Sequence, residues 1–351
     1  MGKTHELRKK INAFVRAIAD KPVFIYISQK ARHADMKCRI GIDVGGTKIA
    51  YGLFNEQYEL IHKIVTPSMP EAEPDIMIGH LAEQVSILIR EVHAEPEEIE
   101  GVGAVFPGHI DYAHGMVMTC ANLPKWKNVF VRKELEQRLR CPVFVDNDAN
   151  VGALAEAKLG KAAGKENLIY VTISTGIGGG LYLNGQIVRG SYGAAGELGH
   201  MQQDAQCGIR CGCGRIGCVE SVASGTGMAR YTKIRIIQGE PSIMPELAGG
   251  LEQITSYHVG VAAKQGDKLA LEILDYAAMQ LARFFLSLYQ IFNVDTVVYG
   301  GGVTKIGPLL MDQIREKFLA LTPLAHEYPM DLIPTSFDDS IGMIGAALLV
   351  E

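Results

Sequence analysis

Two segments with the same pattern, about 130 residues apart, constrain the fold of this chain more than any other feature. Residues 38–67, CRIGIDVGGTKIAYGLFNEQYELIHKIVTP, place β-branched and aromatic residues around a glycine turn and an Asn-Glu turn, which predicts three successive strands. Residues 168–190, LIYVTISTGIGGGLYLNGQIVRG, repeat the order of strand, glycine turn and strand, and their Asn184-Gly185 pair favours a type I′ hairpin. We therefore expect two lobes built on a related β-meander.

The length of the chain points to the same division. It has 351 residues, and because a domain commonly takes about 100–200, two lobes with a cleft are expected. Helical periodicity at 74–93 and 131–140 separates the two strand-rich segments. We predict a small α/β lobe at 37–148, joined by a C-terminal helix at 339–351, and a large α/β lobe at 149–338.

The N-terminal 36 residues differ from the rest because they are rich in Lys and Arg, although the net charge of the whole chain is -5. Apolar residues at helical spacing predict an amphipathic helix at 5–19, followed by the strand-like VFIYIS. A secretory signal is excluded, because Asp20 and Lys21 split the apolar runs. Elsewhere no run of about 18 uncharged apolar residues occurs, so membrane insertion is not expected.

Several interpretations of this basic extension, residues 1–36, remain open. A mitochondrial targeting peptide would be basic and amphipathic, but the acids and the lack of a Ser-rich tract argue against it. Charge alone permits a nucleic-acid arm, yet one helix cannot form a helix-turn-helix. We favour a packing or oligomer-contact extension, or an upstream start with Met36 as the functional beginning. Nucleic acid is therefore not expected as a partner, and a cytoplasmic location is expected.

Neither glycine turn matches a common nucleotide-binding loop. In GIDVGGTK, residues 41–48, Thr precedes Lys, whereas a Walker A loop ends in Gly-Lys-Ser/Thr and opens a helix. GIGGGL at 176–181 lacks the last Gly of G-x-G-x-x-G, and a strand-like sequence follows it. The bare N–H groups of hairpin turns can still approach phosphate, while Asp43 can hold a Mg²⁺ water and Thr47 can donate a hydroxyl. Together with VVYGGGV at 297–303, the turns predict a nucleotide held by both lobes.

Residues 143–160, VFVDNDANVGALAEAKLG, run from an apolar strand through three polar residues into a helix. One of Asp146, Asn147 and Asp148 is expected to cap that helix. Three polar residues exceed what a cap requires, and a carboxylate opposite phosphate turns can take the proton from an attacking hydroxyl during phosphoryl transfer. Asp148 is favoured over Asp146, although spacing hardly separates the two.

The segment HMQQDAQCGIRCGCGRIGC, residues 200–218, holds one His and four of the seven Cys of the chain. Because no export signal precedes it, metal binding is favoured over disulfides. Thiolate and imidazole ligands in a closed set of four suit zinc, which in such sites is usually structural. The spacing leaves five candidate ligands for four positions. Glu197 and Glu220 flank the loop, and a zinc-held loop can direct both toward a hydroxyl-rich substrate.

These motifs together resemble the ROK family (repressors, open reading frames, kinases) of the hexokinase and actin-like superfamily, and most of all its bacterial glucokinases. The likeness runs from about Lys37 to the C-terminus. It rests on an ordered set: GIDVGGTK, NLPKW, DNDANVGALAE, ISTGIGGGLYLNGQIVRGSYGAAGELGH, CGCGRIGCVE, YGGGV and GMIGAALL. The resemblance implies a two-lobed α/β fold of the actin-like, hexokinase type, in which ATP and a sugar meet in the cleft.

The resemblance also assigns roles to residues. Asp148 would be the catalytic base acting on the 6-hydroxyl of the sugar. The sugar would be held by Asn122, Asn147, Glu197, His200 and Glu220. ATP and Mg²⁺ would be held by Asp43, Gly45, Gly46, Thr47, Lys48, Thr175, Gly176, Gly178, Gly179, Gly301 and Gly302. Structural Zn²⁺ would be held by His200, Cys211, Cys213 and Cys218, which leaves Cys207 as a neighbouring thiol.

The implied activity is an ATP-dependent hexose kinase, with glucose as the first choice of substrate and an N-acetylhexosamine as its nearest rival. A non-catalytic, sugar-sensing regulator is the alternative of another class. The family often has Pro-Gly-Pro near the sugar, and this chain has FPGHID, so His109 replaces the second Pro. The resemblance further implies a homodimer or homotetramer.

Overall fold

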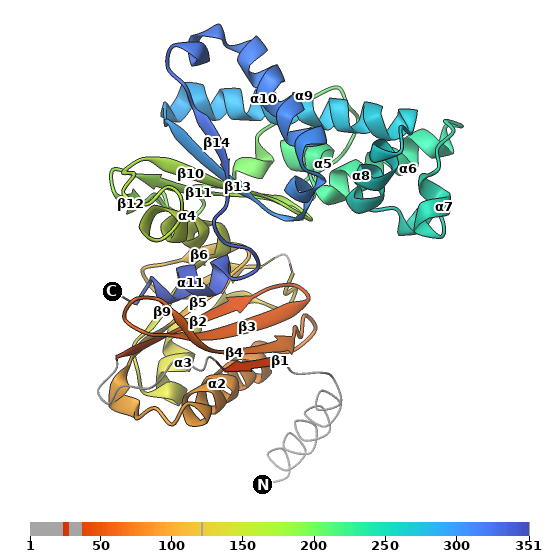
Figure 1. Ribbon diagram of the computed structural model, residues 1–351. Coiled ribbons are helices and arrows are strands. Elements are labelled where there is room, and N and C mark those ends of the chain that lie inside the picture. The colour runs from red at the N-terminus through yellow and green to blue at the C-terminus, as the bar shows by residue number, and fades with distance from the viewer. Residues whose placement is uncertain (1–23, 28–36, 121, 351) are drawn as a thin grey trace. The chain divides into compact units, whose positions relative to one another are not determined.

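The computed structural model describes residues 24–27, 37–120 and 122–350, and the contacts within the chain divide it into two compact units (Figure 1). Unit 1 comprises the described residues up to 155, with 190–194 and 339–350, and unit 2 comprises 156–189 and 195–338. The division at 155/156 falls inside helix α4 (Asp148–Lys158), whereas the boundary expected from the sequence was 148/149. The helix expected at 5–19 lies outside the described residues.

Unit 1 is built on a six-stranded mixed sheet with the order β1-β4-β3-β2-β5-β9. The first four strands of that order are antiparallel, and β5 and β9 continue the sheet parallel to β2. The bounds are β1 (Phe24–Ile27), β2 (Cys38–Val44), β3 (Lys48–Phe54), β4 (Leu60–Pro67), β5 (Ile99–Phe106) and β9 (Val143–Asn147). The three strands expected within 38–67 are thus confirmed.

The parallel strands of this sheet position the polar residues expected at the site. The C-terminal ends of parallel strands lie at one edge of a sheet, and ligands of α/β proteins commonly bind outside that edge. Asp43 lies next to the end of β2, and β9 ends at Asn147, whose Cα partner is Phe106 at the end of β5. Asp43 and Asn147, which are 104 positions apart in the sequence, therefore lie at the same edge of the sheet.

Helices cover both faces of the unit 1 sheet. One face packs against α2 (Pro74–Glu91) and α3 (Val131–Leu139), which confirms the helices expected at 74–93 and 131–140. On the other face, α11 (Ile341–Ala347) packs on β2 and β5. The unit also contains a short helix η1 (Pro96–Glu98) and a small antiparallel sheet of β6 (His109–Asp111), β7 (Met116–Thr119) and β8 (Lys127–Val129).

Close packing of α11 requires glycine in the sheet. A Cβ on Gly41 of β2 would lie 1.9 Å from the carbonyl oxygen of Met343, and a Cβ on Gly103 of β5 would lie 1.8 Å from that of Ala346. Backbone atoms cannot yield as a flexible side chain does, so a side chain at either position would displace the helix. These glycines explain how the last turns of the chain lie flat on the sheet.

We therefore expect Gly103→Ala to lower the free energy of unfolding by about 2–3 kcal/mol, the upper range for overpacking. Urea unfolding followed by circular dichroism would measure the loss. Gly79→Ala on α2 is the matched control, because a Cβ at Gly79 meets nothing within 4 Å and alanine favours a helix by roughly 0.5–1 kcal/mol. Equal stability of the two variants would show that α11 does not require the close approach.

Unit 2 contains a five-stranded sheet with the order β12-β11-β10-β13-β14. Its strands are β10 (Leu168–Ile173), β11 (Ile177–Leu183), β12 (Gln186–Ile187), β13 (Thr296–Gly300) and β14 (Asp331–Pro334). The first three are antiparallel, and β13 and β14 run parallel to β10. Asn184 and Gly185 have φ of 52° and 74°, the left-handed values that a type I′ turn requires, so the predicted hairpin is confirmed.

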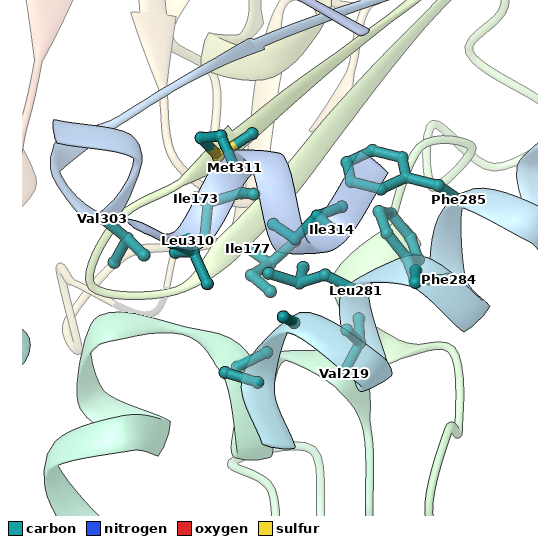
Figure 2. Packing of buried hydrophobic residues seen from close by; sticks show 14 of the residues in the cluster. Ile173, Ile177, Val219, Leu281, Phe284, Phe285, Val303, Leu310, Met311 and Ile314 are labelled. Atoms are coloured by element: carbon teal, nitrogen blue, oxygen red, sulfur yellow. The ribbon is translucent and has the colours of Figure 1, made fainter. Parts of the chain in front are cut away.

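The helices of unit 2 pack around one long helix, α9 (Lys268–Phe292). Phe284, Phe285 and Leu281 of α9 lie in a fully buried cluster with β10, β11 and α10, as Figure 2 shows. The other helices are α5 (Val219–Ala223), α6 (Gly225–Ile237), α7 (Met244–Ala248), α8 (Ser256–Lys264), α10 (Pro308–Leu321), and the short η2 (Leu198–His200), η3 (Leu251–Gln253), η4 (Gly302–Ile306) and η5 (Pro323–His326). Across the described part of the chain, every helix is too short or too polar to cross a membrane.

A buried carboxylate fixes the end of α4. Glu156 is fully buried, and its oxygens accept hydrogen bonds from the Thr335 hydroxyl at 2.5 Å, the Ser336 N–H at 2.7 Å and the Ser336 hydroxyl at 3.1 Å. A buried carboxyl group is tolerated when several donors satisfy it in this way. The helix that begins at Asp148 is therefore held to the segment that follows β14.

Candidate active site and metal cluster

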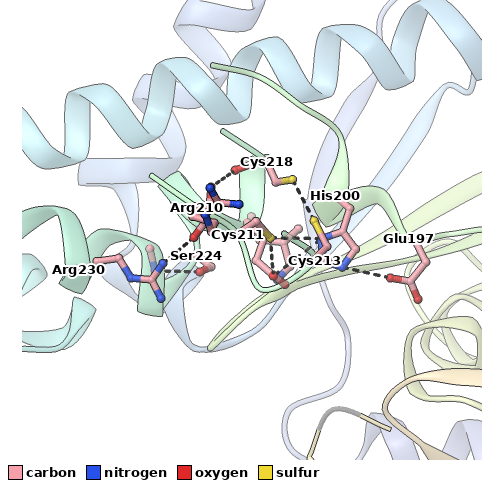
Figure 3. A network of polar contacts seen from close by, with 12 residues as sticks. Glu197, His200, Arg210, Cys211, Cys213, Cys218, Ser224 and Arg230 are labelled. Carbon is pink, nitrogen blue, oxygen red and sulfur yellow. Dashed lines mark hydrogen bonds and ion pairs between the residues drawn. The ribbon is translucent and has the colours of Figure 1, made fainter. Parts of the chain in front are cut away.

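One His and three Cys of the 200–218 loop come together in unit 2. The donor atoms of His200, Cys211, Cys213 and Cys218 all lie within 4.8 Å of one another (Figure 3). Cys213 Sγ lies 3.6 Å from Cys218 Sγ, and Cys211 Sγ lies 3.5 Å from His200 Nδ1. These are the four ligands that the family resemblance implies. Cys207 is not among them, and its sulfur accepts the Ile209 N–H at 3.3 Å.

The spacing and chemistry of this cluster fit zinc. Tetrahedral ligands at about 2.3 Å from Zn²⁺ stand about 3.8 Å apart, close to the observed sulfur–sulfur separation. A hydrogen bond from the Arg215 N–H lowers the pKa of Cys213 to about 6, which favours the thiolate that a metal requires. Burial raises the pKa of Cys211 to about 12, so its thiol would lose a proton to the solvent when metal binds.

Two carboxylates lie next to the cluster. Glu197 is exposed, and Glu220 accepts a hydrogen bond from the β10–β11 turn. Glu197 Oε2 lies 3.6 Å from His200 Nε2, the ring nitrogen that does not face Cys211. Glu220 Oε1 lies 3.6 Å from Cys211 Sγ, while its Oε2 accepts the Ile177 N–H at 3.1 Å. Both residues expected to bind sugar therefore lie beside His200, and Glu220 also links the cluster to the β10–β11 turn.

In unit 1, the three polar residues at the junction of β9 and α4 have different environments. Asp146 is buried, and its Oδ1 accepts the Asn147 N–H at 2.8 Å and the Asn150 amide at 3.0 Å. Asn147 Oδ1 accepts the N–H groups of Ala149 and Asn150 at 2.9 and 3.3 Å, so Asn147 is the helix cap that the sequence predicted. Asp148 is half-buried, and its Oδ1 accepts the Ala149 N–H at 2.9 Å.

Other expected residues of unit 1 lie around the β2–β3 turn. A Cβ on Gly46 would lie 3.2 Å from Asn122 Nδ2, which shows that this turn and the exposed Asn122 are adjacent. Gly45 N–H donates to the Lys48 carbonyl at 3.0 Å, and Thr47 is exposed. The turn therefore presents backbone and hydroxyl groups to the solvent beside Asn122.

The carboxyl group of Asp43, next to the β2–β3 turn, has a raised pKa. It is half-buried, and its Oδ2 lies so close to α11 that a Cβ on Gly342 would approach it within 2.3 Å. Burial raises the pKa of Asp43 to about 6, and the positive charge of Lys48 opposes that rise. Lys48 Nζ is paired with Asp339 at 2.7 Å. A cation near Asp43 would favour its ionised form.

Unit 2 contains a cavity of about 600 Å³, which is large enough for a small-molecule ligand. The sequence predicted Thr175 and Gly302 as ligand-binding residues, and both line it. The remaining lining residues were not predicted; they are Ser174, Gly225, Thr226, Ala229, Arg230, Lys233, Ile254, Thr255, Ser256 and Val303.

A weak signal for these missed residues exists in the sequence. Thr226, Arg230 and Lys233 have the i, i+4, i+7 spacing of one helix face, and the Ser224-Gly225 pair marks the start of α6. Ser224 does cap α6, accepting the Gly227 N–H at 3.0 Å. A helix N-terminus with small residues at the cavity wall suits an anionic ligand.

The glycines of unit 2 that were predicted to bind the nucleotide have different structural environments. Gly176 closes the β10–β11 turn, where its carbonyl accepts the Ser174 N–H at 2.8 Å. Gly178 and Gly179 lie within β11, and a Cβ on Gly179 would approach the Leu198 side chain within 2.4 Å, so packing against Leu198 favours glycine there. Gly301 has a φ of 96° and passes close to the carbonyl of Ile173, whereas a Cβ on Gly302 would meet only Ser174 Oγ, at 3.9 Å.

The chain is similar in sequence to sugar kinases and to a sugar repressor. The chain is 34% identical to a glucokinase of Thermotoga maritima over 312 residues, which cover 89% of this chain and 96% of that protein. It is 32% identical to an N-acetylmannosamine kinase of Escherichia coli, covering 89% and 98%, and 28% identical to a xylose repressor of Caldicellulosiruptor bescii, covering 94% and 81%.

Solved structures agree with the sequence relatives. A ROK hexokinase from Thermus thermophilus superposes with a TM-score of 0.75 at 32% identity, covering 89% of this chain and 97% of that one. A ROK family glucokinase from Streptomyces griseus, in complex with glucose and AMPPNP, superposes with a TM-score of 0.73 at 29% identity, covering 89% and 98%. The actin-like, hexokinase-type α/β fold expected from the sequence is confirmed. A profile of the ROK family matches residues 39–351, and the chain belongs to the ROK family.

Proposed function

We propose that this protein is an ATP-dependent hexose kinase that transfers the γ-phosphoryl group to the 6-hydroxyl of a sugar, with glucose as the first choice. Two relatives named as sugar kinases each align with 89% of this chain, which supports the reaction class. The observation that carries the proposal is the division of roles at the junction of β9 and α4. Asp146 is buried and hydrogen-bonded, Asn147 caps α4, and Asp148 is a half-exposed carboxylate.

In this proposal Asp148 accepts the proton of the 6-hydroxyl. The hydroxyl oxygen then attacks the γ-phosphorus, the bond from that phosphorus to the β-phosphate oxygen breaks, and ADP leaves. Asn147 donates its amide to the Gly108 carbonyl at 3.0 Å, which fixes the side chain beside the proposed base. We propose Asn122, Asn147, Glu197, His200 and Glu220 as the residues that bind the sugar.

The nucleotide would occupy the cavity of unit 2, where Thr175, Gly301 and Gly302 lie at or next to the wall. Gly45, Gly46, Thr47, Lys48, Gly176, Gly178 and Gly179 are proposed as phosphate-binding residues. Asp43 would supply a carboxylate oxygen of the kind that suits Mg²⁺. Bound magnesium would neutralise charge on the transferring phosphoryl group.

We assign structural Zn²⁺ to His200, Cys211, Cys213 and Cys218. With all four positions taken by protein ligands, no open position remains for water. The role of these residues is to hold Glu197 and Glu220 at fixed positions beside His200. A cytoplasmic location and a homodimeric or homotetrameric state stay predictions.

A second substrate class is favoured by a specific observation. The N-acetylmannosamine kinase relative is nearly as similar as the glucokinase, at 32% against 34% identity. A coupled assay of ADP release over free hexoses and N-acetylhexosamines would separate the two, because kcat/KM ratios report discrimination directly. We expect glucose to give the highest ratio. Sugar binding without ADP release from any sugar would instead support the regulator, a class to which the xylose repressor belongs by name.

The nucleotide cavity is tested by filling it. Gly302→Leu is expected to raise the Kd for ATP at least about 10-fold, a change of about 1.4 kcal/mol. A Cβ at position 302 would have only Ser174 Oγ within 4 Å, so there is room for the leucine side chain to occupy the cavity. Isothermal titration with ATP would measure this, and sugar affinity should stay near that of the wild type. Gly79→Leu, in open space on α2, controls for an added leucine. Unchanged ATP affinity of Gly302→Leu would place the nucleotide elsewhere.

A further inference from the structure

Arg230 connects the nucleotide cavity to the metal loop. It lies on α6, lines the cavity of about 600 Å³, and is exposed. Its Nη1 donates a hydrogen bond of 2.8 Å to the carbonyl oxygen of Arg210, and Figure 3 shows the guanidinium directed toward the loop. Arg210 directly precedes Cys211, one of the four clustered ligands. A cavity-lining cation is thus held by the loop that carries the metal ligands.

The carbonyl that Arg230 contacts belongs to a tight turn closed around the ligands. Cys211 N–H donates to the Arg215 carbonyl at 2.7 Å, and Arg210 forms an isolated antiparallel bridge with Ile216. The Arg210 side chain donates to the Gly214 carbonyl at 2.7 Å. The position of the Arg210 carbonyl therefore depends on the closure of this turn, which the metal would hold.

Helix α6 is also connected to the Cys/His cluster through its N-terminal end. Cys218 is the residue directly before α5, and Ser224 ends α5 and caps α6. Gly225 and Thr226, the next two residues, line the cavity, and their N–H groups donate to the carbonyls of Ser174 and Thr175. One ligand is therefore joined to the first turn of α6 through the short α5, and another to its second turn through Arg230.

We propose that Arg230 is a positioning residue that couples metal binding in the loop to nucleotide binding in the cavity. The proposal rests on the proposed function, because it takes the cavity as the ATP site. With the turn closed, the Arg210 carbonyl holds the guanidinium at the cavity wall; with the turn open, Arg230 loses that anchor. Linkage requires that if metal raises nucleotide affinity, nucleotide raises metal affinity by the same factor.

The test measures metal retention rather than turnover. Purified full-length zinc protein is mixed with the chromogenic chelator 4-(2-pyridylazo)resorcinol, with and without saturating ADP and without sugar, and the rate of zinc transfer is recorded. We expect ADP to slow release by roughly 3- to 10-fold, the range that one typical intramolecular hydrogen bond supports. Arg230→Met should abolish the ADP effect, and Arg230→Lys should restore part of it.

Two further variants separate coupling from general damage. Lys233 lines the same cavity but donates to the Glu252 carbonyl at 2.6 Å, so Lys233→Met should keep the slowing once ADP saturates. Arg235 of α6 pairs with Glu240 and Glu272 and does not line the cavity, so Arg235→Met controls for the helix itself. Thermal unfolding of each variant reports whether it folds, and calorimetry reports whether ADP is bound.

The outcomes distinguish this inference from the proposed function. If ADP binds the wild type but leaves zinc release unchanged, or if Arg230→Met keeps the full slowing, the coupling through Arg230 is wrong and the kinase proposal stands. If the wild type does not bind ADP at all, both the nucleotide site and the coupling are wrong. If Arg230→Met fails to fold, Arg230→Lys decides, because a shorter cation with the full ADP effect of the wild type would contradict a role for the guanidinium.

Discussion

Asp148→Asn is expected to lower kcat for phosphoryl transfer by about 10²- to 10⁴-fold, the contribution typical of a general base, while sugar affinity changes little. The amide cannot accept the proton of the 6-hydroxyl, but it has nearly the same size as the carboxylate. Its oxygen can also keep the local contact to the Ala149 N–H. Steady-state ADP release and calorimetric glucose binding on the same preparation would measure both quantities.

Asp146→Asn is the matched control for this prediction. Asp146 is 1% exposed and accepts two hydrogen bonds through one oxygen, so its loss of charge should act mainly on stability. We expect a lower midpoint of thermal unfolding with much of the turnover retained. If Asp148→Asn kept near-normal turnover while Asp146→Asn lost it, the base assignment would have to move to Asp146.

Cys218→Ser is expected to remove stoichiometric zinc and to lower the free energy of unfolding by about 3 kcal/mol or more, because a closed structural site loses a ligand. Cys218 is fully buried, and it directly precedes α5, which carries Glu220. Sugar affinity should fall together with stability, since Glu220 and His200 lie at the cluster. Metal analysis, thermal unfolding and glucose titration of the same sample would follow the three changes.

Cys207→Ser provides the control from the same loop. Cys207 lies outside the four-residue cluster and packs at the edge of the unit 2 core, so this variant should retain zinc and sugar affinity. Treatment of the wild type with a chelator should reproduce the Cys218→Ser result. A metal-free protein with unchanged glucose affinity would refute the link between the cluster and the sugar site, whatever its stability.

Much of the local structure could be predicted because it depends on residues close in the sequence. The turn at Asn184-Gly185 needs two left-handed residues, and this pair adopts that conformation at little cost. The polar run at the end of β9 predicts a helix cap, since Asn and Asp side chains accept the free N–H groups of a first turn. The four residues of the Cys/His cluster lie within 19 residues, so their gathering needs only one loop.

The choice among chemically similar groups could not be predicted in the same way. Asp146 and Asp148 are equivalent in type and differ by two positions, yet only packing shows that Asp146 is buried and bonded to Asn150. Gly179 belongs to a glycine-rich segment, and only the fold shows that it lies within β11 against Leu198. Sequence periodicity states which residues are neighbours along one element, and it does not state which atoms of a second element face them.

By itself, the sequence determined the strand–turn–strand segments, the helix that begins at Asp148 and the concentration of one His and four Cys in residues 200–218. Only the tertiary structure decided which four of these five residues gather, and it alone decided the cavity of unit 2, whose wall comes from four separate segments at 174–175, 225–233, 254–256 and 302–303. Short-range patterns specify backbone conformation, because propensities and local hydrogen bonds act over a few residues. A cavity exists only where distant segments pack, so the register of the sheet and the packing of α6 and α8 decide which side chains line it.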